Sequence, residues 1–199
     1  MGDCLGFLVG KSSTNEFSFH VEGDARKFLY IQAHHQEGYD VLALIVDIEK
    51  NQELTRAHCQ VIGYRASNGM LKTLRVPLEP DCKIFAADDA FVQQVLGLEK
   101  TKHSAYIGTL EGRDGLSVYL DLNKLLTRHV AILAKSGSGK SYCTGVLLEE
   151  IMERNVPIVV IDPHGEYSSL KYPTDRPEKL ARFGLKAKGY GERIVEYSP

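Results

Sequence analysis

The chain has 199 residues, enough for one large domain or two small ones, and its composition is ordinary for a globular protein. A formal net charge of −2 excludes a strong overall attraction to nucleic acid or to an anionic membrane surface. No apolar run reaches transmembrane length and no secretory signal is visible, so we expect a cytoplasmic protein without a membrane partner. The four cysteines are scattered without metal-ligand spacing, which favours reduced thiols.

The first part of the chain, to about residue 86, has the pattern of an all-β domain. Asn68-Gly69 is a strong signal for a two-residue hairpin turn. Alternating or β-branched runs bounded by turn residues predict about six short strands, which would form a small barrel or sandwich. These runs cover residues 4–9, 16–21, 27–33, 41–48, 57–66 and 71–77.

A helical connector is predicted next, over residues 89–98, with Phe91, Val95 and Leu98 on one face. A strand pair is expected after it, at 105–110 and 116–120. We therefore place a domain boundary near residue 100, with one domain over 1–100 and a second over 101–199.

The most informative stretch is HVAILAKSGSGKS, at residues 129–141. An apolar strand is predicted at 130–133, followed by a glycine-containing loop and a helix from about 139 to 154. Strand, glycine loop, lysine, hydroxyl and helix are the parts of a phosphate-binding P-loop, in which backbone amides approach the phosphates closely. In such a loop Lys140 reaches the β- and γ-phosphates and Ser141 binds Mg²⁺. The strict pattern has glycine where this chain has Ala134.

A second apolar strand is predicted at 158–161, and a third at 194–197, so this domain should be α/β with a parallel sheet. A sheet of so few strands cannot be buried by one or two helices, so we expect this to be the N-terminal part of a longer protein. The strand at 158–161 leads into Asp162 and Glu166. If it lies next to the P-loop strand, Asp162 is a candidate Mg²⁺ ligand; if another strand separates them, the metal-binding aspartate comes later. Periodicity alone leaves both layouts open.

The block from HVAILAKSGSGKSY through VPIVVIDPHGEY resembles the archaeal HerA-type ATPases, which are hexameric DNA translocases or helicases. The resemblance implies an N-terminal small β-barrel like that of the ATP synthase over 1–100, followed by the start of a RecA-like P-loop domain over 101–199. It also implies that the metal aspartate, the catalytic glutamate and the arginine finger lie beyond residue 199. On this reading Asp162 and Glu166 border the nucleotide site.

The resemblance implies site residues for ATP and Mg²⁺. Lys140 is the catalytic candidate and Ser141 the candidate for the metal, while Asp162 is a metal candidate in the layout that places its strand next to the P-loop strand. Arg128 stands where the family has a nucleotide-contacting arginine. The expected nucleotide-binding residues are Ser136, Gly137, Ser138, Gly139, Lys140, Ser141, Tyr142 and Arg128.

The implied function is ATP-driven movement of duplex DNA through the pore of a homo-hexamer, in DNA end resection and double-strand-break repair with a NurA-type nuclease. Acidic side chains outnumber basic ones over residues 1–100, which suits a barrel that docks protein better than one that grips DNA. Two alternatives remain: a conjugation or secretion ATPase that moves protein, and, for this chain alone, a non-catalytic oligomerising or partner-docking module.

Overall fold

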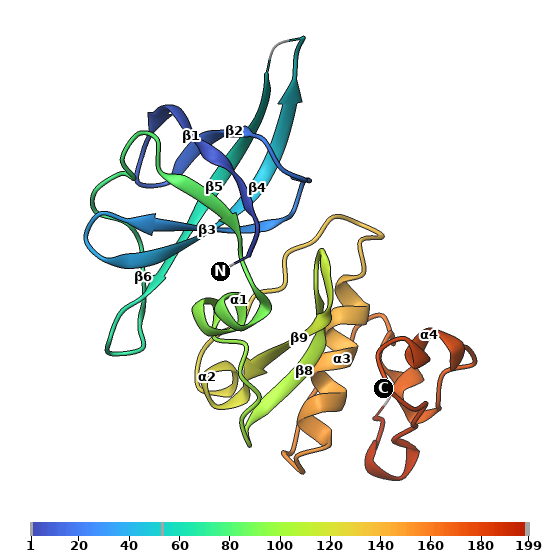
Figure 1. The fold of residues 1–199 in the computed structure, drawn as a ribbon. Helices are drawn as coiled ribbons and strands as arrows, with labels where there is room; N and C mark the ends of the chain where they lie inside the picture. The colour runs from blue at the N-terminus through green and yellow to red at the C-terminus, as the bar shows by residue number, and fades with distance from the viewer. Residues whose placement is uncertain (1, 53, 198–199) are drawn as a thin grey trace. The chain divides into compact units, whose positions relative to one another are not determined.

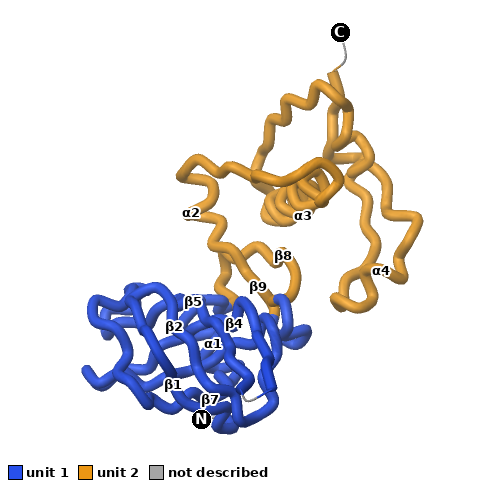
Figure 2. Tube along the Cα trace, turned by 90° about the horizontal axis from the view of Figure 1, so that it is seen from above, with its two compact units in different colours: residues 1–99, 111–116 blue, residues 100–110, 117–199 orange. Residues whose placement is uncertain are grey.

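The structure is a computed structural model that describes residues 2–52 and 54–197. The chain divides into two compact units (Figure 2): residues 1–99 with 111–116, and residues 100–110 with 117–199. The chain passes from the first unit to the second near residue 100, and residues 111–116 group with the first unit. Among the described residues, no helix combines the length and hydropathy needed to cross a membrane.

The first unit is a closed antiparallel β-barrel (Figure 1). Six strands pair in the order β2-β1-β7-β3-β4-β5, the pairing of β2 with β5 closes the ring, and β6 extends β5. The predicted small barrel is therefore confirmed. Its strands are β1 (Cys4–Ser12), β2 (Glu16–Val21), β3 (Tyr30–His35), β4 (Tyr39–Lys50), β5 (Thr55–Arg65), β6 (Leu71–Lys72) and β7 (Lys83–Ala86).

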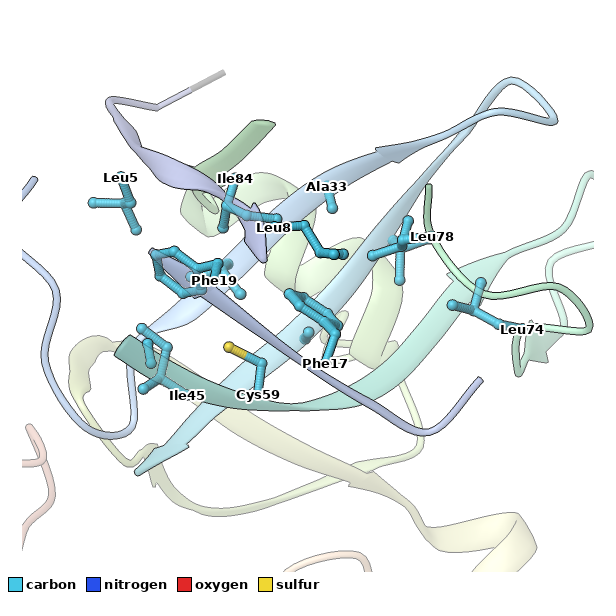
Figure 3. Close-up of a cluster of buried hydrophobic side chains, with 14 residues drawn as sticks. Leu5, Leu8, Phe17, Phe19, Ala33, Ile45, Cys59, Leu74, Leu78 and Ile84 are labelled. Atoms are coloured by element: carbon cyan, nitrogen blue, oxygen red, sulfur yellow. The ribbon is translucent and has the colours of Figure 1, made fainter. Parts of the chain in front are cut away.

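The barrel interior is filled by side chains from every part of the ring (Figure 3). Phe17 and Phe19 of β2 point inward because alternate residues of a strand face the same side. They meet Ile45 of β4 and Cys59 of β5, and all four side chains are buried. The alternation that the sequence shows at 16–21 is thus the packing pattern of the core.

The hairpin predicted around Asn68-Gly69 is present, but its loop has three residues, 67–69, and not the two predicted. The Ala66 amide donates to the Met70 carbonyl at 3.0 Å, and Gly69 has φ +75°, as a tight hairpin turn requires. Helix α1 (Asp89–Leu96) begins after Asp88, whose side chain accepts from the Phe91 amide at 2.8 Å. Val92, rather than Phe91, is the buried residue of its first turn.

The second unit contains most of a strand pair and the elements that follow it (Figure 1). Helix α3 packs along β8 through a small core of Ala105, Leu122 and Ile151. All four cysteines of the chain are free. The elements are β8 (Ser104–Leu110), β9 (Arg113–Asp121, shared with the first unit), α2 (Leu122–Leu126), α3 (Lys140–Met152), the 3₁₀ turns η1 (Ser168–Lys171) and η2 (Gly191–Arg193), and α4 (Glu178–Ala181).

The prediction of three strands for a parallel sheet is wrong, because the structure has no strand at residues 130–133, 158–161 or 194–197. Their apolar side chains are largely exposed: Leu133 and Val159 at 93%, Ile161 at 90%. A parallel strand depends on hydrogen-bonded neighbours and on cover over both faces. None of these segments is paired within the described residues, so apolar composition alone does not make them strands. The RecA-like start therefore stays a prediction.

Candidate phosphate-binding site

The loop before α3 has the backbone geometry that its glycines predict. Gly137 and Gly139 have φ angles of +76° and +93°, a region that other L-residues rarely adopt. A β-carbon added at either glycine would meet no atom within 4 Å, so the backbone conformation, and not a lack of room, is what requires glycine here. The Ser138 hydroxyl and amide both bond to the Lys135 carbonyl, at 2.6 and 3.2 Å, which closes the turn.

The N-terminus of α3 suits an anion. The helix begins at Lys140, and its capping residue Gly139 offers no side chain to the first amides. Unpaired amides and the positive end of a 13-residue helix attract phosphate. Lys140 is exposed and, within the part of the chain that the structure describes, forms no ion pair. Its ammonium group is thus available to a phosphate at the loop.

Helix α3 is held against β8 by two side chains that complete the edge of that strand. The Glu150 carboxylate accepts from the Tyr106 amide at 2.9 Å, and Arg154 donates to the Ser104 carbonyl. Glu150 and Arg154 also pair with each other at 2.9 Å, one helical turn apart. The backbone N–H and C=O groups at the edge of β8 would otherwise bond to water. Here they bond to side chains of α3 and of the residues just after it, and so orient the helix that begins at the loop.

The other end of α3 is fixed by the 188–193 segment. The Tyr190 hydroxyl donates to Glu153 Oε1 at 2.7 Å, and Lys188 bonds to the same oxygen at 2.5 Å. The bond from Lys188, followed by that from Tyr190, lowers the pKa of Glu153 below its usual value. Arg193 donates to the Met152 carbonyl at 2.6 Å, where the last helical carbonyls lack partners.

The two carboxylates after the predicted 158–161 strand have different partners. Asp162 Oδ2 accepts from the Tyr167 amide at 2.9 Å, and this bond is the main reason why its pKa lies below the usual value. Glu166 instead reaches α3, where its Oε2 accepts from the Ser141 hydroxyl at 2.8 Å. The sequence makes Asp162 the candidate metal ligand, but in the structure it is Glu166 that reaches Ser141.

A cavity of about 700 Å³ opens beside Ser141 along one side of α3. This size is in the range of small-molecule sites. It is bounded by α3, the turn after Asp162, η1 and α4, and it combines aromatic side chains with both signs of charge. Lining residues include Ser141, Tyr142, Glu149, Tyr167, Arg176 and Lys179. Burial, together with the neighbouring Glu150 and Glu153, raises the pKa of Glu149.

Most of the predicted nucleotide-binding residues lie together at the loop and the start of α3, but Arg128 has no bond to them in the part of the chain that the structure describes. The run from Ser136 to Ser141 forms the loop and the first residues of α3, and Tyr142 projects from α3 with 70% of its surface exposed. Arg128 is exposed just after α2, and within the described residues it has no hydrogen bond that ties it to the loop. No group of three or more His, Cys, Asp or Glu side chains within residues 2–52 and 54–197 is arranged to hold a metal ion.

The residues present fit a magnesium-bound nucleotide. Mg²⁺ takes oxygen ligands and usually binds through one or two protein groups together with substrate phosphates, so a hydroxyl beside a carboxylate is a suitable protein contribution. The loop glycines, the uncapped amides and Lys140 supply the complementary phosphate-binding groups. A small β-barrel is thus followed along the chain by a loop and a helix N-terminus that carry the groups a phosphate-binding site needs.

Comparison with known proteins gives the family. Residues 105–199 match the family model described as the central domain of helicase HerA. The chain is 36% identical over 173 residues to a probable DNA double-strand break repair helicase HerA of Methanocaldococcus jannaschii, a match that covers 87% of this chain and 33% of that protein. It is 28% identical over 173 residues to the corresponding helicase HerA of Pyrococcus furiosus, covering 84% and 30%.

A probable helicase of M. jannaschii is 43% identical over 103 residues, which cover 52% of this chain and 19% of that protein. The chain is thus a member of the HerA helicase family by homology, as the resemblance of its motifs indicates. It spans about a third of the length of the HerA relatives that it matches.

Proposed function

We propose that this chain is the barrel and the beginning of the ATP-hydrolysing domain of a HerA-type DNA translocase or helicase that acts in DNA end resection and double-strand-break repair. The observation that carries the proposal is the loop at the start of α3, with two glycines at positive φ, an exposed Lys140 and Ser141 paired to a carboxylate. The names of the relatives support the biological setting.

In the proposed nucleotide complex, amides of the loop and of the first turn of α3 bind the phosphates, and Lys140 neutralises the charge of the β- and γ-phosphates. The Ser141 hydroxyl binds Mg²⁺. Tyr142 and the cavity beside Ser141 receive the ribose and base, because that cavity adjoins Ser141 and carries aromatic side chains. Bound ATP supplies the free energy for movement along DNA. Arg128 is proposed to act on the nucleotide of a neighbouring subunit.

We further propose a homo-hexamer with duplex DNA in its pore, and a barrel, similar to that of the ATP synthase, that docks a NurA-type nuclease. The acidic balance of residues 1–100 supports protein docking over DNA gripping. The isolated chain is proposed to bind nucleotide without turning it over. Asp162 lies outside any strand and bonds to its own turn, which supports this view.

The test compares ATP hydrolysis and nucleotide binding by the unaltered protein, Lys140→Ala and the matched control Lys102→Ala, which removes an exposed lysine outside the loop. Because Lys140→Ala loses a charge-assisted contact, we expect this variant to bind nucleotide about 10- to 100-fold more weakly. In the full-length protein, the same variant should not hydrolyse ATP. Lys102→Ala should match the unaltered protein.

Duplex DNA should stimulate hydrolysis. The same turnover with and without DNA would favour the conjugation or secretion ATPases instead. Unchanged turnover in Lys140→Ala would refute the assignment of the loop.

A further inference from the structure

The turn at residues 162–167 separates two carboxylates that the sequence places only four residues apart. Asp162 accepts the Tyr167 amide at 2.9 Å, and further bonds from the amides of Glu166, His164 and Gly165 also lower its pKa. Its negative charge is therefore satisfied within its own turn. Such an arrangement stabilises the turn.

The same turn brings Glu166 to the phosphate-binding loop. Gly165, at φ +67°, reverses the chain, and its amide donates to the Asp162 carbonyl at 3.3 Å. The Glu166 carboxylate then accepts from the Ser141 hydroxyl at 2.8 Å. Ser141 is the second residue of α3 and is half-buried, whereas Glu166 is exposed at the rim of the cavity. This contact joins two segments 25 residues apart.

The direction of this hydrogen bond decides what Ser141 can do. A hydroxyl has one proton to donate and two lone pairs that accept. Because the proton is directed to Glu166, the lone pairs of the serine oxygen are free to face a cation, and the adjacent negative charge makes that oxygen a better ligand. Partners of this kind orient metal ligands in many sites.

We propose that Glu166 is a positioning residue that holds the Ser141 hydroxyl in the orientation that binds the Mg²⁺ of a magnesium nucleotide, while Asp162 builds the turn that presents Glu166. This inference rests on the proposed function, because it concerns the metal bound at the same loop. It assigns a role beside the metal to Glu166, whereas the sequence names Asp162 as the candidate for the metal, and it removes Asp162 from direct metal contact.

The experiment measures binding of a fluorescent ATP analogue to the chain over a series of Mg²⁺ concentrations, and separately in EDTA. Glu166→Ala should raise the Mg²⁺ concentration at half-saturation by about 10- to 100-fold, the usual effect of removing a residue that orients a metal ligand. Binding in EDTA should be unchanged. Glu166→Gln keeps an oxygen acceptor without the charge and should give a smaller increase. Glu178→Ala removes an exposed carboxylate on α4 and is the matched control.

The outcomes separate the possible failures. An unchanged Mg²⁺ requirement in Glu166→Ala refutes the inference, and so does an equal loss of binding with and without Mg²⁺, which would mean that Glu166 only ties the turn to α3. If the unaltered chain shows no Mg²⁺-dependent binding, the proposed function fails together with the inference. Far-UV circular dichroism checks that each variant remains folded.

Discussion

The side chain of Glu150 offers the sharpest test of how α3 is held. Its carboxylate accepts the Tyr106 amide of β8 at 2.9 Å and pairs with Arg154 at 2.9 Å, with only 22% of the Glu150 side chain exposed. Glu150→Ala removes the acceptor and leaves the amide without a partner on the helix. A hydrogen bond to a charged group contributes about 1.5–3 kcal/mol, so we expect a loss of about 2 kcal/mol at this contact.

Hydrogen exchange of the Tyr106 amide measures this loss directly. Since about 1.4 kcal/mol corresponds to a factor of ten, the amide should exchange about 30-fold faster in Glu150→Ala than in the unaltered chain. Glu150→Gln retains an oxygen acceptor and should lie between the two, and Glu178→Ala should have no effect. Equal protection of Tyr106 in Glu150→Ala would show that the helix does not depend on this contact.

Two further predictions concern the segments around α3. Tyr190 is only 5% exposed, and Tyr190→Phe removes the hydroxyl that donates to Glu153. The free energy of unfolding should fall by about 1.5 kcal/mol, measured by urea titration followed by circular dichroism. An unchanged midpoint would contradict this role of the hydroxyl. The depressed pKa of Asp162 means that its stabilising effect is complete above its ordinary value of 3.8 and is lost as the pH falls through the lower folded value. A nuclear magnetic resonance titration of the Tyr167 amide should therefore have its midpoint below pH 3.8, and a midpoint at or above it would refute the contact.

Much of the barrel can be predicted from local patterns. The alternation around Phe17 and Phe19, the Asn68-Gly69 turn and the Asp88 cap each act through neighbouring residues, so the sequence contains the information. Strand β7 was missed because its four residues lie in a stretch without alternation, and only its pairing with β1 and β3 makes it a strand. Closure of the ring depends on such long-range pairing.

The same contrast applies to the candidate site. The glycine loop and the helix that begins at Lys140 could be predicted because a phosphate-binding loop has a fixed local order of residues, while the binding of phosphate itself stays a prediction. The strands predicted at 130–133, 158–161 and 194–197 failed because a parallel strand depends on neighbours that no local pattern specifies. The i,i+4 spacing of Glu150 and Arg154 is visible in the sequence, but their bonds to β8 are not.

By itself, the sequence determined which residues form the loop, where the helix begins and which two acids lie nearby. Only the tertiary structure decided which partner each acid has. Asp162 bonds to the backbone of its own turn, and Glu166 bonds to Ser141, 25 residues away in the sequence. The physical reason is that a carboxylate takes the strongest donors that the folded backbone places within reach. The turn at Gly165 therefore decides which donors each carboxylate can reach.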